Sequence, residues 1–320
     1  MSELLNSEIE QVKNTFFPTT VARVEKAKSM DLRFVHYTSA EAALGILTNR
    51  EVWMRNAMTM NDSTEIEYGF NCLKNAYEGD AGKLFKTVLE ENFPGCTTEL
   101  EASFNAWLPG FRRDTYLTCV SEHDQSEDQL GRLSMWRAYG GRSAVALVLK
   151  GAPFHNESNV LKAYTSPVAY LNSDTFSTQF MEVAERMRDA SDLLLKLGRD
   201  RVFQLSFHML RFSVLCTKHI GFHEEKEWRV IYSPTIEQSD KIQTAVATIN
   251  GTPQRIHKIP LQNVPDQGLT GMEISEIIDR IIIGPCQFPH AIYTAFHHLL
   301  KEAKVEHPED MLVISEIPLR

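Results

Sequence analysis

Hydrophobic and polar residues alternate along parts of this chain and follow a helical period in others. Residues 32–37 have apolar and aromatic side chains at strand-like spacing. Ala43, Ile46 and Leu47 follow at i, i+3, i+4 and predict an amphipathic helix over about 38–48, which Asn49 can end. The intervening Thr38-Ser39-Ala40-Glu41 has the order of a capping box. We therefore predict a strand-to-helix corner with His36 and Tyr37 near the strand end, a place where free amides favour a small-molecule site.

The same patterns predict the other elements. Further helices are expected over about 1–16, 19–30, 63–77, 82–111 with a break at Pro94-Gly95, 127–139, 175–197, 199–217 and 290–303. Further strands are expected at 52–54, 116–121, 144–149, 163–171, 224–232, 244–249, 255–260, 277–283 and 311–314. Asn61-Asp62 is a turn signal, and Asp62-Ser63-Thr64-Glu65 is a second capping box.

This order of elements favours an α+β fold. We expect an N-terminal helical segment over residues 1–30, followed by a single domain over 31–320 with a helical insertion at about 174–217.

Composition narrows the functional classes. A formal net charge of −9 gives no overall attraction to phosphate backbones or anionic membranes. The odd count of five cysteines, without a C-x-x-C pair, argues against a disulfide framework and favours a reducing compartment. Because the N-terminus lacks an apolar signal core and no run of about eighteen apolar residues occurs, we expect a cytoplasmic protein without membrane contact.

Several familiar site motifs are missing. The sequence has no G-x-G-x-x-G after a strand, no P-loop and no G-x-S-x-G. His219 and His223 have a metal-ligand spacing, but Gly221 between them would break the helix that aligns them, so we predict no metal site.

What remains are polar and aromatic groups at predicted strand and helix ends. These candidates are His36, Tyr37, Thr38, Ser121, Trp136, Tyr139, Glu225 and Glu227. Strand alternation over 224–232 places Glu225, Glu227 and Arg229 on one face. Each candidate also has a structural reading: a lone His at a strand end is commonly structural, a Glu-bearing strand face can simply be solvated, and Trp136 at helical spacing can be core.

The ordered motifs resemble a widespread group of bacterial proteins classed as a domain of unknown function. They are H-Y-T-S at 36–39, M-W-x-x-Y-G at 135–140, E-x-E-W-R at 225–229 and I-I-I-G-P at 281–285. That group is in turn similar to ADP-ribosyltransferase toxins of the H-Y-E class. The resemblance implies an ADP-ribosyltransferase-like split antiparallel β-sheet with helical insertions.

The resemblance also implies an enzyme that uses NAD as substrate. Glu227 would be the catalytic carboxylate, since breaking the nicotinamide–ribose bond develops positive charge on the ribose. His36 would hold a ribose hydroxyl, and Glu225 would orient the acceptor, although spacing leaves open which of the two carboxylates is catalytic. The remaining NAD-binding positions implied are Tyr37, Thr38, Ser121, Trp136 and Tyr139.

The function expected from the resemblance is transfer of ADP-ribose to RNA, DNA or protein, with nucleic acid ahead of protein. Such an enzyme would be a toxin or phage-defence effector, and a toxin–antitoxin pairing would require a neutralising partner. NAD hydrolysis in the same pocket and a non-catalytic nucleotide-binding regulatory module remain alternatives. A metal-dependent nuclease that uses His36, Asp62 and Glu65 is a weaker third.

Overall fold

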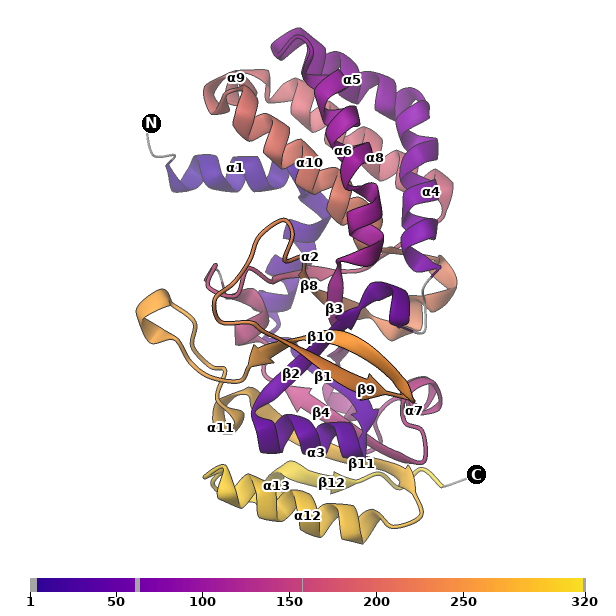
Figure 1. Cartoon of the computed structure of the whole chain (residues 1–320), viewed down its shortest axis with the longest axis vertical. Coiled ribbons are helices and arrows are strands. Elements are labelled where there is room, and N and C mark those ends of the chain that lie inside the picture. The colour runs from indigo at the N-terminus through magenta and orange to yellow at the C-terminus, as the bar shows by residue number, and fades with distance from the viewer. Residues whose placement is uncertain (1–4, 61–63, 157, 319–320) are drawn as a thin grey trace. The chain divides into compact units, whose positions relative to one another are not determined.

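The computed structural model describes residues 5–60, 64–156 and 158–318 (Figure 1). Its α-helices are α1 Asn6–Phe16, α2 Pro18–Ser29, α3 Ala40–Asn49, α4 Glu65–Glu78, α5 Asp80–Asn92, α6 Cys96–Arg113, α7 Leu133–Tyr139, α8 Ser173–Asp189, α9 Ser191–Leu197, α10 Arg199–Leu215, α11 Ile274–Ile277, α12 Pro289–Glu302 and α13 Pro308–Met311. Its strands are β1 Arg33–Ser39, β2 Glu51–Asn56, β3 Tyr116–His123, β4 Ser143–Leu149, β5 Tyr164–Pro167, β6 Ala169–Tyr170, β7 Thr217–Lys218, β8 Glu227–Tyr232, β9 Gln243–Ile249, β10 Thr252–Pro260, β11 Ile278–Cys286 and β12 Leu312–Ile314. No helix among the described residues is long and apolar enough to cross a membrane.

The chain divides into two compact units, each assembled from three stretches of sequence. Unit 1 takes Met1–Glu25, Ala57–Thr115 and Ser166–His223, and unit 2 takes Lys26–Asn56, Tyr116–Thr165 and Glu224–Arg320. The helical insertion predicted at about 174–217 is thus one of three stretches that build the helical unit 1, and the N-terminal helix α1 belongs to the same unit.

Unit 1 is a helical bundle with an aromatic core. Helix α5 packs on α8, and α4 packs on both α8 and α10. The axes of α4 and α10 approach closely because Gly69 has no side chain: a Cβ there would lie 2.2 Å from the carbonyl oxygen of Val214. The rings of Phe85 and Phe180 contact each other between α5 and α8 at a tilt of 43°, with centroids 5.4 Å apart. A buried ion pair joins Lys218 to Glu65 at 2.6 Å.

Unit 2 is built on a mostly antiparallel sheet in the order β12-β11-β4-β1-β3-β2-β10-β9, with β8 paired to β3 off this path. Of the pairings on the path, only β11 with β12 is parallel. Helices α3 and α12 pack over one face, with α12 beside β12 (Figure 1). The short helix α7 packs over the other face, against β1. This arrangement confirms the α+β prediction.

The sheet forks where β1 leaves β3. The two strands pair only over Arg33–Val35, whereas β1 continues beside β4 as far as Ser39 and β3 continues beside β8. The His36 ring lies at the fork and donates a hydrogen bond from Nδ1 to the Cys119 carbonyl, at 2.9 Å. The side chain thereby supplies a hydrogen-bond donor to a carbonyl in the stretch of β3 that no longer pairs with β1.

Three local predictions need correction. The helix expected over 127–139 begins only at Leu133, since residues 125–127 form a 3₁₀ turn closed by the Asp124 side chain. The cap of α3 is Ser39, whose Oγ accepts the amide of Ala42. Glu225 does not lie on the predicted strand; it ends a 3₁₀ turn, and β8 begins at Glu227. The turn at Asn61-Asp62 and the start of the second capping box lie outside the described residues.

Candidate functional site

The predicted site residues divide between the two faces of the unit 2 sheet. Ser121 of β3 lies opposite both Val35 of β1 and Glu227 of β8, so these three side chains share one face. Tyr37, two residues after Val35, points to the same face and packs with α7. His36 and Thr38 alternate to the opposite face, the one that α3 and α12 cover. The structure therefore brings Tyr37, Ser121 and Glu227 onto one face but does not place His36 with them.

Tyr37 is anchored by two contacts. Its hydroxyl accepts the backbone amide of Arg132 at 2.8 Å, and its ring meets the Trp136 ring edge-on, with centroids 4.7 Å apart. Burial raises the pKa of Tyr37 to about 12, so the hydroxyl stays neutral at ordinary pH. The side chain thus fixes the start of α7 against β1.

Trp136 is enclosed by glycines. A Cβ at Gly131 would lie 2.5 Å from the indole ring, and one at Gly284 would lie 2.9 Å from it. A Cβ at Gly140 would lie 2.6 Å from the Trp136 carbonyl oxygen. The indole Nε1 donates to the Leu130 carbonyl at 2.8 Å. Because the ring is buried and closely packed, the structure favours the core reading of Trp136, and it explains why glycines follow Tyr139 and Ile283 in the sequence motifs.

Tyr139 and Glu225 meet at the edge of this face. The Tyr139 hydroxyl donates to Glu225 Oε1 at 3.3 Å, and both side chains are partly exposed. Between Glu225 and β8, Lys226 adopts a left-handed backbone with φ of 45°, and its carbonyl accepts the Glu122 amide at 2.9 Å. This turn sets the Glu225 carboxylate off the strand.

Glu227 is the first residue of β8 and is buried, at 6% exposure. Its carboxylate accepts Nε of the equally buried Arg229, which lies two residues on along the same face, at 2.8 Å. The pair fixes the carboxylate in one orientation, and a counter-charge is what a carboxylate in such surroundings requires. The two carboxylates therefore differ in exposure and partner. Glu225 is partly exposed beside Tyr139, whereas Glu227 is buried in an ion pair with Arg229.

His36 is partly buried, and burial lowers its pKa against the opposing effect of the Cys119 carbonyl. The ring is therefore neutral at pH 7, with the Nδ1 proton used at the fork of the sheet. Thr38 pairs with Val145 of β4 and precedes the capping residue Ser39.

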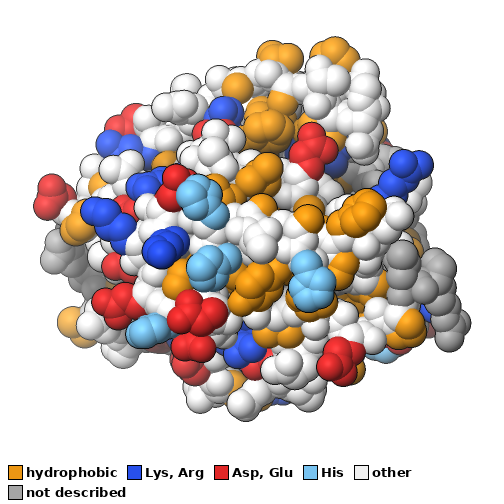
Figure 2. All heavy atoms as spheres, turned by 90° about the horizontal axis from the view of Figure 1, so that it is seen from below, with side chains coloured by type: hydrophobic (Ala, Val, Ile, Leu, Met, Phe, Trp, Pro, Cys, Tyr) orange, Lys and Arg blue, Asp and Glu red, His pale blue; other side chains and the backbone are white. Residues whose placement is uncertain are grey.

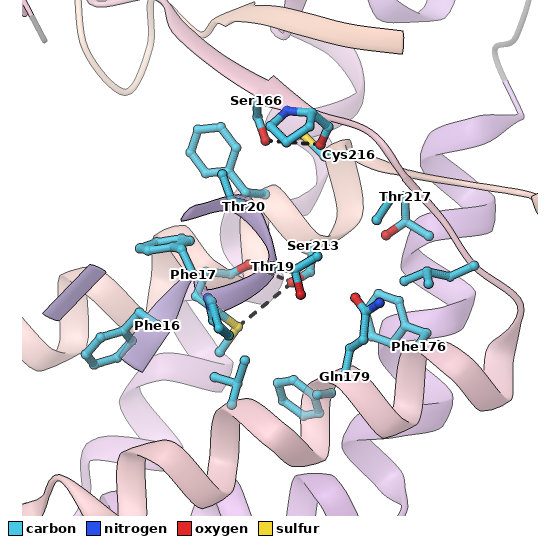
Figure 3. Close-up of a pocket in the computed structure, with 18 of the residues that line it drawn as sticks. Phe16, Phe17, Thr19, Thr20, Ser166, Phe176, Gln179, Ser213, Cys216 and Thr217 are labelled. Atoms are coloured by element: carbon cyan, nitrogen blue, oxygen red, sulfur yellow. Dashed lines mark hydrogen bonds between the residues drawn. The ribbon is translucent and has the colours of Figure 1, made fainter. Parts of the chain in front are cut away.

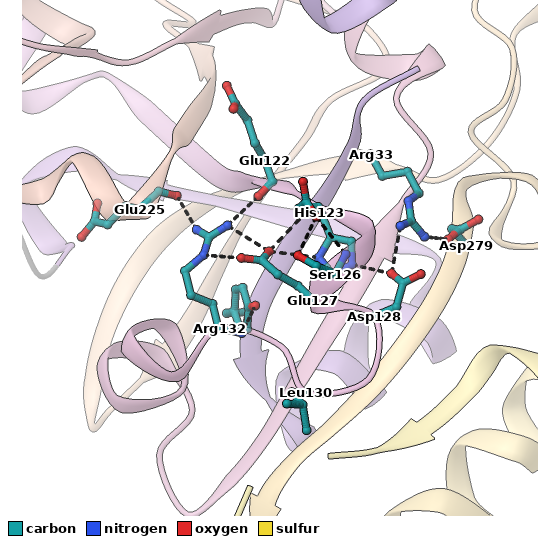
Figure 4. Close-up of polar contacts among 12 residues, drawn as sticks. Arg33, Glu122, His123, Ser126, Glu127, Asp128, Leu130, Arg132, Glu225 and Asp279 are labelled. Carbon is teal, nitrogen blue, oxygen red and sulfur yellow. Dashed lines mark hydrogen bonds and ion pairs between the residues drawn. The ribbon is translucent and has the colours of Figure 1, made fainter. Parts of the chain in front are cut away.

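Arg132 is a residue that the sequence reasoning missed, and it organises the site's polar contacts (Figure 4). Its guanidinium pairs with both carboxylate oxygens of Glu127, at 2.9 and 3.0 Å. The same group donates to the carbonyls of Glu122, Glu224 and Glu225, at 2.9, 2.8 and 3.4 Å. Arg132 thus ties the loop before α7 to the turn that carries Glu225. The sequence signal for this ion pair was the acidic run at 122–128 followed closely by an arginine.

A second group of charges, Arg33, His123, Asp128 and Asp279, lies next to this network (Figure 4). Asp128 accepts His123 Nε2 at 2.8 Å and Arg33 at 2.9 Å, and Arg33 also pairs with Asp279 of β11 at 2.6 Å. Burial opposes ionisation of Asp128, yet these hydrogen bonds leave its pKa lowered. Burial lowers the pKa of His123, so its ring is neutral at pH 7. These contacts pin the loop over 124–132 to both β1 and β11.

Pockets elsewhere have different chemistry. A pocket of about 100 Å³ in unit 1 is lined mainly by apolar side chains, among them Phe16, Phe176 and Phe212, with Ser213 and Thr217 among its polar groups (Figure 3). None of its lining residues carries a carboxylate. A pocket of about 410 Å³ in unit 2 mixes charges of both signs, including Lys258 in an ion pair with Glu51. Neither pocket includes a predicted site residue.

The face formed by α12 and α13 carries several histidines beside carboxylates (Figure 2). His297 and His307 lie 3.7 and 3.5 Å from Glu309, and His298 lies 3.3 Å from Glu302. Across the described residues, no group of three His, Cys, Asp or Glu side chains has the geometry to hold a metal ion.

Comparison with protein-family models matches residues 135–230 to one family, described as a protein of unknown function (DUF2971). The matched stretch begins within α7, ends within β8 and contains Trp136, Tyr139, Glu225 and Glu227. This agrees with the expected similarity to a domain of unknown function. No curated protein and no solved structure matches the chain.

Proposed function

We propose that this protein is an NAD-dependent ADP-ribosyltransferase that transfers ADP-ribose to a macromolecular acceptor. The observation that carries the proposal is the pair of carboxylates at the start of β8: Glu225 hydrogen-bonded to Tyr139, and Glu227 on the face of the sheet that it shares with Ser121. The forked antiparallel sheet beneath them is in keeping with the split sheet of that superfamily.

The chemistry needs negative charge where the ribose becomes cationic. As the bond between ribose C1 and the nicotinamide nitrogen breaks, its electron pair leaves with nicotinamide and positive charge develops on the ribose. A fixed carboxylate near that carbon lowers the free energy of the transition state without reorganising. Glu225 and Glu227 differ in exposure, so we assign substrate contact to Glu225 and electrostatic support to Glu227, held by Arg229.

The aromatic side chains on the same face also differ in exposure, and we assign their roles accordingly. Tyr139 is partly exposed and can stack on or hydrogen-bond to the substrate, whereas Tyr37 and Trp136 are buried against each other and position α7. Ser121 offers a hydroxyl next to Glu227. His36 and Thr38 point to the opposite face, so we assign them to the fork of the sheet and not to the ribose.

The acceptor proposed is RNA, DNA or protein, with nucleic acid first. A net charge of −9 means that a nucleic-acid acceptor would be held through local stacking and a few arginines, as single strands commonly are. An enzyme of this kind would act as a toxin or phage-defence effector. A toxin would need a neutralising partner in its own cell, which copurification with the endogenous chain would reveal.

The test is incubation of the purified chain with NAD labelled in the adenylate part and a cell lysate. We expect label in macromolecules, removed by one of RNase, DNase or protease. Glu225→Gln and Glu227→Gln should each lower transfer by about a hundredfold or more, the scale seen when one electrostatic contact to a transition state is removed. Glu224→Gln is the matched control, because that residue precedes Glu225 on the same turn and contributes a backbone carbonyl to Arg132.

The other outcomes discriminate the alternatives. Free ADP-ribose without labelled macromolecule would indicate an NAD glycohydrolase. NAD that binds without being consumed would favour a regulatory module, and equal activity in Glu224→Gln, Glu225→Gln and Glu227→Gln would refute the assignment of these carboxylates.

A further inference from the structure

Strand β9 is an edge strand of the unit 2 sheet, at the opposite end of the strand order from β12. It pairs with β10 on one side, and no other described strand pairs with it. Its residues are exposed or partly exposed along the whole strand, and Val246 at its centre is 76% exposed, more than the other large exposed hydrophobic residues of the described chain. An apolar residue so exposed in the middle of an edge strand invites pairing with another strand.

The hairpin turn shows which backbone groups face the open side. Asn250 and Gly251 have φ of 50° and 80°, as in a two-residue type I′ turn. Such a turn makes Ile249 and Thr252 a hydrogen-bonded pair, and the pairs then alternate along the hairpin. Pro253, which has no N–H, accordingly falls in a pair without hydrogen bonds, opposite Thr248. The N–H and C=O groups of Thr244, Val246 and Thr248 therefore point away from β10.

The usual protection of an edge strand is absent from β9. Gln243–Ile249 contains no charged residue, no proline and no glycine. Natural sheet edges are commonly blocked by one of these or by a bulge, and the β9–β10 register runs without a shift from Gln243 to Ile249. Nothing in the strand itself opposes addition of a further strand.

The sequence of β9 is complementary to itself. Thr244-Ala245-Val246-Ala247-Thr248 reads the same in both directions around Val246. When two copies pair antiparallel with Val246 opposite Val246, Thr244 lies opposite Thr248 and Ala245 opposite Ala247. The Val246 pair and both Thr pairs then exchange backbone hydrogen bonds through the groups that point outward. Cross-strand Thr–Thr and β-branched pairs are favourable, and no like charges meet.

We propose that β9 is a homodimerisation edge, at which two copies of the chain join antiparallel across a two-fold axis at Val246. The contact is isologous, so it closes after two copies, and neither copy keeps an open β9 edge to which a third could add. One strand pair is small compared with a stable protein interface, so the dimer is reversible and concentration-dependent. This dimerisation is independent of the proposed enzymatic function.

The sharpest test is cysteine crosslinking. In the proposed register the two Val246 Cα atoms lie about 5.5 Å apart, within disulfide reach. Val246→Cys should therefore form an intermolecular disulfide under mild oxidation at least tenfold faster than Thr244→Cys, whose two copies would lie about 13 Å apart along the strands. A mixture of Thr244→Cys and Thr248→Cys should crosslink as a heterodimer. Equal rates for Val246→Cys and Thr244→Cys would overturn the proposed register.

Sedimentation of the full chain provides the second measurement. The 36.5 kDa chain should shift toward twice this mass as its concentration rises. Val246→Lys should abolish the shift, because two ammonium groups would face each other, and Val246→Thr should keep it. Thermal unfolding of Val246→Lys should match that of the unmodified chain at low concentration, since the side chain is exposed. A chain that stays monomeric at all concentrations, or a dimer that survives Val246→Lys, would overturn the proposal.

Discussion

Arg132 offers a direct test of how the turn bearing Glu225 is held. Its guanidinium donates five hydrogen bonds, two to the Glu127 carboxylate and one each to the carbonyls of Glu122, Glu224 and Glu225. Arg132→Met keeps most of the apolar stem and removes every one of these contacts. The substitution also leaves the Glu127 carboxylate without its guanidinium partner.

The cost can be worked from exposure. The side chains of Arg132 and Glu127 are 12% and 18% exposed, so their pair lies between a surface and a buried ion pair. Breaking a fully buried pair costs about 3–5 kcal/mol, and a surface pair is worth about 0–1 kcal/mol. Adding the loss of the carbonyl contacts, we expect the free energy of unfolding to fall by about 3 kcal/mol. For a unit of this size that lowers the melting temperature by about 6–12 °C.

The assay is thermal unfolding followed by circular dichroism, together with hydrogen exchange of the peptide that spans residues 220–232. Exchange should accelerate there in Arg132→Met and remain unchanged in α12, the control region. Arg132→Lys should recover part of the loss, since an ammonium can pair with Glu127 but cannot reach every carbonyl. A double-mutant cycle with Glu127→Gln should show coupling above about 1 kcal/mol. A loss under 0.5 kcal/mol, about the scale of an ordinary surface substitution, with unchanged exchange would refute the role given to Arg132.

Three further predictions concern single side chains of unit 2. The pKa values of His36 and His123 are lowered on folding, so the unfolded chain binds more protons than the folded chain below about pH 6.5. The free energy of unfolding should therefore fall as pH drops from 7.5 to 5.5, by about 1.4 kcal/mol for each histidine that stays neutral. Chemical denaturation across this range should show a weaker pH dependence in His36→Asn. Gly284→Ala should destabilise by about 1–3 kcal/mol, since its Cβ would lie 2.9 Å from the Trp136 ring, and tryptophan fluorescence should report the displaced indole. Tyr139→Phe should leave the melting temperature within about 1 °C, because the side chain is partly exposed, while lowering NAD turnover if the proposed function holds.

The sequence predicted most elements because their periodicity reflects burial. The apolar run at 144–149 became β4, a buried strand that pairs with β1 and β11, and the break at Pro94-Gly95 separated α5 from α6. Prediction failed where side chains form hydrogen bonds with backbone groups and so replace the hydrogen bonds of a regular helix. Residues 127–132 have helix-compatible composition, but Asp124 caps a 3₁₀ turn and Arg132 draws the loop toward the 224–225 turn.

The sequence could propose candidate residues for the site, but it could not say which of them share a face, and it missed Arg132. Strand alternation already places His36 and Tyr37 on opposite faces of β1. Which of the two lies on the same face as Glu227 depends on the register of β1, β3 and β8. That register joins residues almost two hundred positions apart, and no local pattern encodes it. The left-handed Lys226 is a second example, because a single unusual φ in a non-glycine residue moved Glu225 off the strand.

The side chains on the two faces of β1 have different roles, one in stability and one in the proposed activity, and mutagenesis can separate them. On one face, neutral His36 closes the fork of the sheet through the Cys119 carbonyl, a contact that contributes to stability. On the other, Tyr37 anchors the start of α7, and the end of α7 presents Tyr139 to Glu225. His36→Asn should therefore lower stability and leave NAD consumption per folded molecule nearly unchanged, whereas Glu225→Gln should do the reverse. If His36→Asn instead abolished turnover in a fully folded chain, a ribose-binding His36 would be correct, and the face assignment drawn from strand register would fail.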